Sequence, residues 1–598
     1  MKKSLYISAL ALMLAGTSLT SCSDFLEAEN KSGGKEADEF FQGNPSSLLY
    51  SAYASLKQYN DQEDIYDHGT DLYIVTRGQK VDAFYQYSTL TADNTVVGNY
   101  YGACYSTINY ANGVIKYASD NADLCSQAKF LKAYAYYCLI QQFGGVPLVD
   151  EYIQKEERSF SRASLKDSYE YLIELLKPLV TELPNATDYT SGKPSQQAAA
   201  ALLAKVYLAY AWDCYTTVTD AEAGTYSVES DCTTYTAKAR EYAQKAIDLG
   251  GFNIASQTFE QKWSPNNRNN AEHIFAIKYL LSGTPKISSY GNTQSDTYGG
   301  YYENWVLKCN SLNQQSIKSM YLFEKNDARY EGTFMTTFYK GADLNTGYFA
   351  YYTEDAETLA KHEIGLKFYP WYYSNAEVSA DIAKHTSQFT KKSKITLLQS
   401  PVIPYEIDGK AGEGESVESF NNKTDNGVRV KKFDDPDANG YCYRDIVLLD
   451  LSEMYLVMAE AYLLEGNTSE CYNNLNVLRS RAGLADITSA TKPSYLTSNV
   501  ISNAANFSYR DIDVILDERA REMYAQKTRW TDLRRTKQLI LYNVMYNEHL
   551  TDGANSLKGT DGNFKWYRPI PSAEISSNAA VTNADQNPGY TNSSSSEN

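Results

Sequence analysis

Clusters of aromatic residues give this chain its clearest candidate chemistry. The sequence contains 53 tyrosines, more than its 34 glycines, although glycine is among the common residues of globular chains. A tyrosine or tryptophan ring has a flat apolar face and a polar edge, which suits sugar or peptide binding and also suits helix packing. Two stretches, "SDTYGGYYENW" (295–305) and "KFYPWYY" (367–373), gather such rings without a helical period. We predict that some of their aromatics contact a ligand, the candidates being Tyr298, Tyr301, Tyr302, Trp305, Tyr369, Trp371 and Tyr372.

Polar side chains that could bind sugar hydroxyls occur together in a shorter segment. A sugar site needs such groups because an unpaired hydroxyl is costly to bury. The segment "GTDLYIVTRGQ" (69–79) offers Asp71, Arg77 and Gln79, and we predict ligand contacts there. The alternative is that Asp71 caps a turn and Arg77 pairs with an acid of the scaffold. The aromatic candidates have a similar alternative, since rings also dominate protein cores.

Catalytic and metal-binding patterns are sparse. The five histidines (68, 273, 362, 385 and 549) are scattered, and no HExxH, GxSxG or P-loop pattern occurs. The carboxylates of "DERARE" (517–522) lie among arginines at helical spacing, which indicates a solvated or ion-paired face. The stretch "DPDANGYCYRDI" (435–446) begins like a calcium loop, but Pro436 and a final Ile446 favour a turn. We therefore predict no catalytic residue, no cofactor and no metal.

Helices in pairs must position these candidates. The stretches at 194–215 and 235–254 alternate alanine with leucine or tyrosine, and the second reaches Gly250-Gly251. The stretch at 452–484 repeats the design, with a turn at Gly466-Asn467, and the helix within 126–143 stops at Gly144-Gly145. Small residues facing large ones at this period are typical of tetratricopeptide-like helical hairpins. The predicted fold is mostly α.

The region 281–445 differs from these hairpins. It is rich in Gly, Ser, Asn and aromatics and has little sustained period. We predict a single domain at 37–590, with a helical scaffold at 37–280 and 446–590 and an irregular ligand-binding region at about 281–445. The polar tail 591–598 is predicted to be disordered.

The N-terminus indicates export. Lys2 and Lys3 precede an apolar run from Leu5 to Leu14, followed by small residues and Cys22. This pattern predicts a signal peptide at 1–21, lipid attachment at Cys22 and a tether at 22–36, the alternative being an ordinary signal with a chance cysteine. A net charge of -18 argues against a nucleic-acid partner. The other cysteines form no CxxC pair, and their disulfide state stays open.

Ordered motifs along the whole chain resemble the SusD/RagB family of outer-membrane nutrient-binding lipoproteins. They include "AKFLKAYAYYCLIQQFGGVPLV" (128–149), "LLDLSEMYLVMAEAYL" (448–463), "LDERAREMYAQKTRWTDLRR" (516–535) and "QNPGY" (586–590). The resemblance implies four tetratricopeptide-like hairpins, no enzymatic activity and a SusC-like TonB-dependent transporter as partner. The implied ligand is a glycan, or a peptide in some branches. Besides the glycan-binding and peptide-binding alternatives, a third hypothesis is a secreted helical glycoside hydrolase.

The family pattern bears on particular residues. Segment 69–79 lies where family members often place polar sugar contacts. Tyr100 falls near a position where the family often has tryptophan, so it is a candidate for stacking or for the core. Two departures are visible, because the family usually has an arginine at the position of Asp450 and an acidic-glycine pair at the position of Gln526-Lys527. We expect both departures to affect the ion pairs around these positions more than the function of the protein.

Overall fold

The computed structural model describes most of the chain between residues 37 and 590. Its described residues are 37–590 apart from 76–79, 155–158, 186, 280–290, 299–301, 304–305, 308–312, 344–345, 390–393, 398–405, 408–409, 412, 416–427, 437–441, 498–500 and 502–506. The predicted signal peptide, Cys22, the tether up to residue 36 and the tail 591–598 lie outside them. Among the described helices, none combines the length and apolar character that a membrane crossing requires.

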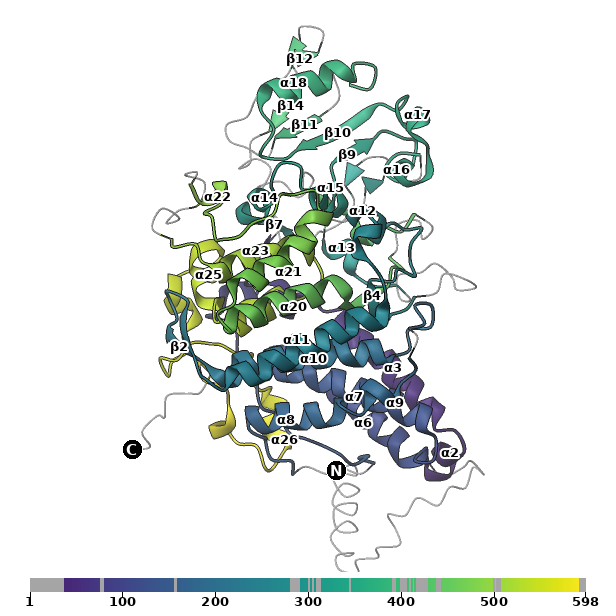
Figure 1. The fold of residues 1–598 in the computed structure, drawn as a ribbon, viewed down its shortest axis with the longest axis vertical. Coiled ribbons are helices and arrows are strands. Elements are labelled where there is room, and N and C mark those ends of the chain that lie inside the picture. Colours follow the sequence, from purple (N-terminus) through teal and green to yellow (C-terminus); the bar gives the residue numbers. More distant parts are fainter. Residues whose placement is uncertain are drawn as a thin grey trace, which may run out of the picture.

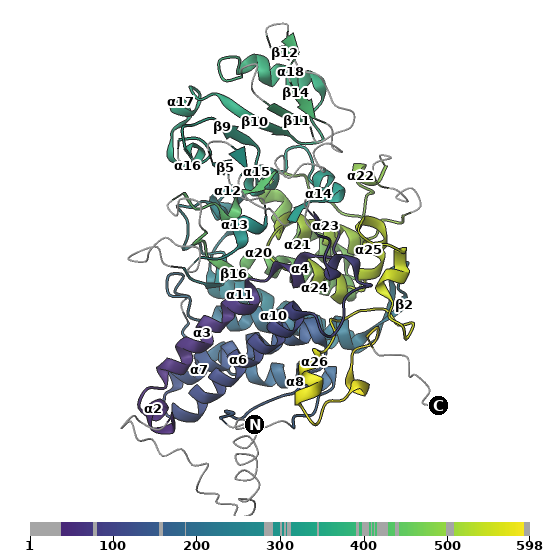
Figure 2. The ribbon, with the colours of Figure 1, turned by 180° about the vertical axis from the view of Figure 1, so that it is seen from behind.

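Pairs of packed helices build the body of the molecule, and they confirm the mostly α fold (Figure 1). The main pairs are α6 (Thr95–Tyr117) with α7 (Ala122–Phe143), α10 (Gln196–Tyr215) with α11 (Cys232–Gly250), and α20 (Leu451–Leu464) with α21 (Thr468–Arg481). The helix α3 (Ser46–Asn60) packs on α6, and α8 (Leu165–Leu176) packs on α7 and α10. Seen from behind, α3, α6 and α7 lie together at the lower end of the body (Figure 2).

Small side chains let the central helix α10 pack on several neighbours. Ala198 to Ala201 are all fully buried, and the hydroxyl of Ser195 caps the helix by accepting from the Ala198 N–H. Because alanine projects little from the backbone, α8, α11 and α20 can approach α10 closely. The glycine stops are also confirmed: Gly144 follows α7 with φ 77° and Gly251 follows α11 with φ 58°, both in the left-handed range that glycine favours.

Several further helices complete the frame. The C-terminal part contributes α23 (Asp511–Glu522), α24 (Arg529–Arg535) and α25 (Leu539–Tyr546). The remaining α-helices that the structure describes are α2 (Ala37–Gly43), α4 (Glu63–Asp67), α5 (Ala83–Gln86), α9 (Leu179–Glu182), α12 (Phe259–Trp263), α13 (Gln294–Thr297), α14 (Ile317–Leu322), α15 (Ala328–Thr333), α16 (Ala350–Thr353), α17 (Ala356–Leu359), α18 (Asn375–Lys384), α22 (Ser494–Thr497) and α26 (Ser572–Ser577).

A small α/β lobe stands above the helical body in Figure 1. Its sheet has the strand order β14 (Glu413–Glu415), β11 (Lys394–Leu397), β10 (Ile364–Tyr369) and β9 (Thr337–Tyr339). Strands β10 and β11 are parallel, and β9 is antiparallel to β10. The helix α18 buries Val378 and Ile382 against β10, in a cluster with Ile364 and Tyr369. The sheet therefore gives order to a region that the sequence predicted as irregular.

Short strand pairs occur elsewhere in the described residues. They are β1 (Tyr73–Val75) with β7 (Asn313–Gln315), β2 (Thr216–Asp220) with β3 (Thr225–Val228), β4 (His273–Ile277) with β16 (Ile446–Asp450), β8 (Phe334–Met335) with β15 (Arg429–Val430), β5 (Tyr302–Glu303) with β6 (Val306–Leu307), and β12 (Glu406–Ile407) with β13 (Lys410–Ala411). The β2–β3 hairpin separates α10 from α11 and was not predicted. The β4–β16 pair joins the chain before the lobe to the chain after it.

A network of buried ion pairs surrounds α23. Glu518 pairs with Arg329 at 2.5 Å and with Arg521 at 2.9 Å, and all three side chains are almost fully buried. The predicted ion pairing of "DERARE" is therefore confirmed, whereas its solvated face is not. Leaving one member of a buried pair without its partner costs about 3–5 kcal/mol, so this network constrains how the body and α15 pack together.

The two departures from the family pattern contact each other. The Gln526 amide nitrogen lies 3.3 Å from the Asp450 carboxylate, which also accepts from Lys262 at 2.8 Å. Lys527 has φ 59°, a left-handed conformation that explains why a glycine suits this position. Its ammonium pairs with Glu63 at 3.1 Å. Local ion pairing is thus rearranged here rather than lost.

Candidate functional site

Four aromatic side chains lie together where α14 packs against the turn that precedes α18. We call Tyr321, Trp371, Tyr372 and Tyr373 the aromatic platform. Trp371 stacks on Tyr321 with ring centroids 5.4 Å apart and planes 29° from parallel, and Tyr372 stacks on Tyr373 at 5.5 Å and 29°. Trp371 and Tyr372 meet edge to face at 5.9 Å. Tyr321 is buried, whereas the other three are half-buried and so keep part of each ring in contact with solvent.

Local sequence explains why these rings are presented at the surface. Strand β10 ends at Tyr369, and Pro370 follows with its fixed φ, so the strand cannot simply continue. The Tyr373 N–H donates to the Pro370 carbonyl at 3.0 Å, which closes a turn. Ser374 then caps α18 in a capping box with Glu377. The pattern "PWYYSNAE" (370–377) is therefore a turn held between a strand and a capped helix.

A hydrogen bond fixes the Trp371 ring on the body. The indole nitrogen donates to the Phe323 carbonyl at 3.0 Å, directly after α14. With Tyr321 stacked on the same indole, two independent contacts hold the ring before any ligand arrives. Such preorganisation favours binding because less side-chain entropy is lost on association.

Charged groups border the platform. Lys325 pairs with Glu377, and Asp381 pairs with Lys367 at 2.7 Å and accepts from the Tyr369 hydroxyl at 2.7 Å. The hydrogen bond from Lys325 lowers the pKa of Glu377 to about 2, with a further contribution from Ser374. Burial opposes ionisation of Asp381, but hydrogen bonds from Lys367 and Tyr369 outweigh it and lower its pKa. Both carboxylates are ionised at neutral pH and can accept hydroxyl hydrogen bonds.

The Tyr372 hydroxyl is a polar group of the platform that could bind a ligand. It has no hydrogen-bond partner among the described residues. Burial raises its pKa, so the hydroxyl stays protonated and can donate. Stacking faces, one hydroxyl donor and ionised acceptors at the rim together form the set of groups that a sugar site requires.

Asp71 is not available to a ligand, which corrects the sequence prediction. Its side chain is fully buried, accepts from Arg529 at 2.7 and 2.6 Å, and accepts from Lys318 at 2.7 Å. Burial raises the pKa of this carboxyl, yet the charges of Arg529 and Lys318 outweigh burial and lower it well below the usual range. Asp71 therefore holds α14 and α24 together instead of facing solvent.

Three predicted aromatic contacts are also buried. Tyr298 donates to Asp67 and is 1% exposed, and Tyr369 donates to Asp381 and is 1% exposed. Tyr100 is fully buried, and its hydroxyl lies 2.7 Å from that of Tyr66. It lines a partly open pocket of about 80 Å³ beside Lys205 and Glu453, which is a space for a few water molecules. These three rings belong to the core and present no face to a ligand at the surface.

The remaining predicted contacts fall outside the description. Arg77, Gln79, Tyr301 and Trp305 are not among the described residues, and of Tyr302 only the backbone, in β5, is described. Of the predicted contacts, Trp371 and Tyr372 are therefore the pair that the structure brings together on a partly exposed surface.

Sequence reasoning missed two members of the platform. Tyr373 follows Trp371 and Tyr372 in the same stretch, so the clustering of aromatics was a usable signal. Tyr321 gave none, since it lies in an ordinary helix about fifty positions earlier and meets Trp371 only through the fold. The candidate calcium loop is described only in part: Asp435 is buried and pairs with Arg268 at 2.6 Å, and residues 437–441 are not described.

Comparison with known proteins places this fold in a defined group. Residues 271–590, more than half of the chain, match the SusD family, and residues 24–208 match a family described as starch-binding and associating with the outer membrane. The chain belongs to the SusD family. It is 23% identical to SusD-like protein P2 of Formosa agariphila, with 96% of this chain and 97% of that protein covered.

Solved structures share the fold. A laminarin-binding SusD-like protein has a TM-score of 0.59 at 18% identity, covering 92% of this chain and 99% of that one. A protein whose crystal structure contains xylogluco-oligosaccharide has a TM-score of 0.55 at 19% identity, covering 84% of this chain and 85% of that one. At these identities the likeness concerns the fold.

Proposed function

We propose that this protein captures an oligo- or polysaccharide at the cell surface through the aromatic platform. The observation that carries the proposal is the preorganised, partly exposed set of Trp371, Tyr372 and Tyr373 on a SusD-family frame. Two fold relatives whose descriptions name glycans support the same ligand class. The aromatic rings stack on the apolar faces of sugar units. The carboxylates at the rim of the platform, Glu377 and Asp381, and the Tyr372 hydroxyl form hydrogen bonds with the sugar hydroxyl groups.

We infer that the captured glycan passes to a SusC-like TonB-dependent transporter in the outer membrane. Lipid attached to Cys22 would keep the binding protein at the surface beside that partner. Support comes from the family and from the N-terminal sequence pattern. Purification of a tagged chain from solubilised outer membranes should yield a large outer-membrane protein in equal amount. Recovery of this chain alone under mild detergent would contradict the partnership.

The inferred role is binding without catalysis. The two glutamates of α23, Glu518 and Glu522, would be the natural candidates for a glycosidase pair, and both are buried and engaged by arginines. Incubation of the purified protein with each bound glycan should release no reducing ends. Product release that is lost on Glu518→Gln would instead favour the helical hydrolase.

Affinity gel electrophoresis against plant, host and microbial polysaccharides tests the ligand class. Retardation by one polysaccharide is expected, and Trp371→Ala should reduce the affinity about 30-fold, because buried aromatic anchors typically contribute about 2 kcal/mol or more. Trp566→Ala removes another half-buried tryptophan from a different part of the chain and serves as the matched control. If no polysaccharide retards the protein and calorimetry then shows that it binds peptides, the platform is a peptide-binding site instead.

A further inference from the structure

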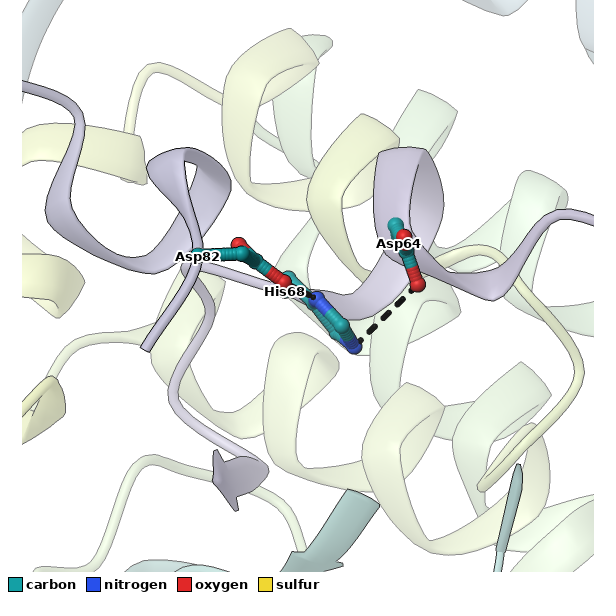
Figure 3. A group of neighbouring side chains, drawn as sticks. All are labelled: Asp64, His68 and Asp82. Carbon is teal, nitrogen blue, oxygen red and sulfur yellow. Dashed lines mark hydrogen bonds and ion pairs between the residues drawn. The ribbon is translucent and has the colours of Figure 1, made fainter. Parts of the chain in front are cut away.

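A second cluster of side chains lies apart from the platform, at the end of α4. Asp64, His68 and Asp82 offer ligand atoms that all lie within 4.8 Å of one another (Figure 3). Asp64 and His68 are four residues apart, which places both on one side of α4 and its C-cap. Asp82, on the other side of the imidazole, is the cap residue of α5.

The two imidazole nitrogens of His68 have different surroundings. Nδ1 lies 2.5 Å from the Asp82 carboxylate, a hydrogen bond that holds the ring. Nε2 is buried and has no hydrogen-bond partner, although the His68 side chain is only 5% exposed. Its nearest ion-pairing atom is Asp64 Oδ1, at 3.6 Å, which is too long for a hydrogen bond. A buried polar atom without a partner needs an explanation.

We propose that Asp64 and His68 bind one Zn²⁺ ion, with Asp82 as the outer carboxylate that orients the imidazole. A carboxylate on the far ring nitrogen is the usual arrangement behind a metal-bound histidine. In a tetrahedral zinc site with ligands at about 2.0–2.1 Å, two ligand atoms stand about 3.3 Å apart, close to the separation of Nε2 and Asp64 Oδ1. Two water molecules complete the shell, since Asp64 is 36% exposed and opens the site to solvent.

Local charge favours a divalent cation. Asp64, Asp67 and Asp82 surround a single imidazole, and among the described residues no lysine or arginine pairs with Asp64 or Asp82. A bound Zn²⁺ compensates this excess of acids and joins the two ends of segment 69–81.

Two other histidines paired with carboxylates, His362 and His385, lack this combination. His362 Nε2 is already paired with Glu354 at 2.7 Å, so that nitrogen is occupied. His385 is four residues from Asp381, but Asp381 is neutralised by Lys367 at 2.7 Å. His362→Gln therefore provides a matched control, because it removes a histidine paired with a carboxylate without touching the proposed site.

Calorimetric titration of chelator-treated protein with Zn²⁺ tests the site. One equivalent should bind to the wild type. His68→Gln should abolish that binding, Asp64→Asn should weaken it at least tenfold, and Asp82→Asn should weaken it about 10- to 100-fold, as losses behind a metal ligand usually do. His362→Gln should bind as the wild type does. Co²⁺ at the same site should show the intense visible absorption of four-coordinate cobalt.

The contrary outcomes are clear. No binding by the wild type, or binding that survives both His68→Gln and Asp64→Asn, would overturn the proposal and leave His68 as a protonated partner of two carboxylates. Asp64 is partly exposed, so Asp64→Asn should fold even if His68→Gln does not. The melting temperature without metal shows whether each variant is folded, and a Zn²⁺-dependent rise should occur in the wild type and be smaller in Asp64→Asn at the same Zn²⁺ concentration.

Discussion

Replacing Asp71 with asparagine separates a scaffold role from a ligand role. The carboxylate accepts hydrogen bonds from Arg529 and Lys318 in a fully buried site, and Lys318 then keeps only Asp517, at 3.0 Å. Removing one partner of a buried ion pair typically costs about 3–5 kcal/mol. An unfolding entropy of about 2.1 cal/mol/K per residue over about 550 residues gives about 1.2 kcal/mol/K. The expected loss in melting temperature is therefore about 3–4 °C.

The assay combines thermal unfolding with glycan binding. Asp71→Asn should lower the melting temperature while leaving the affinity for the glycan within twofold of the wild type. Glu174→Gln is the matched control, since its ion pair with Lys177 at 2.7 Å is exposed and contributes about 0.5 kcal/mol or less. If Asp71→Asn weakens glycan binding and leaves the melting temperature unchanged, the reasoning is refuted and Asp71 is a ligand contact.

Acid unfolding gives the same prediction a second readout. The charges of Arg529 and Lys318 overcome the effect of burial and depress the pKa of Asp71 in the folded state, so its contribution to stability is complete above the unfolded value of about 3.9. That contribution is lost as the pH falls further, toward the depressed pKa. The stability difference between wild type and Asp71→Asn should therefore be constant from about pH 7 to 5 and shrink below about pH 4.

Two further predictions follow from buried groups. Lys262→Met leaves Asp450, at 2.8 Å from the lost ammonium, without its cation, and it removes one of two cations from Glu272, which keeps Arg481 at 2.8 Å. It should lower the urea midpoint by an amount equivalent to about 3–5 kcal/mol, whereas Lys238→Met at an exposed pair should not. Equal midpoints for the two variants would contradict the buried network. Burial raises the pKa of Cys138 to about 11 and those of Cys214 and Cys471 to about 12. These thiols should therefore react slowly with iodoacetamide at pH 7.5 in the native protein and rapidly in urea. Fast labelling of any of the three in the native protein would contradict this prediction.

Much of the helical frame could be predicted from the helical periodicity of the sequence and from the glycines that end helices. The helix that ends at Gly144 and the turn at Gly466 were read correctly because both depend on neighbouring residues along the chain. The start of α6 at Thr95 likewise depends on a neighbouring residue, because the Asn94 side chain caps the helix by accepting from the Val96 and Val97 N–H groups. The sheet of the lobe was missed, since its strands β9 and β11 reach β10 from separated segments.

The site was only half predictable, for a physical reason. Spacing along the chain gathers Trp371 and Tyr372, and a local turn then presents them. Whether a polar residue faces solvent or a buried partner depends on contacts across the fold. Asp71 and Arg529 are separated by 458 positions, so nothing in segment 69–79 could indicate that the carboxylate was already engaged. The same holds for Tyr298, whose hydroxyl partner Asp67 lies 231 positions away.

A crystal structure with an oligosaccharide from the retarding polysaccharide tests the central claim most directly. The account predicts sugar rings stacked on Trp371 and Tyr372, with hydroxyl groups within hydrogen-bond distance of the Tyr372 hydroxyl or the rim carboxylates. Density for the glycan elsewhere, for example in the surface hollow of about 600 Å³ lined by Arg162, Trp566 and Tyr567, would contradict it.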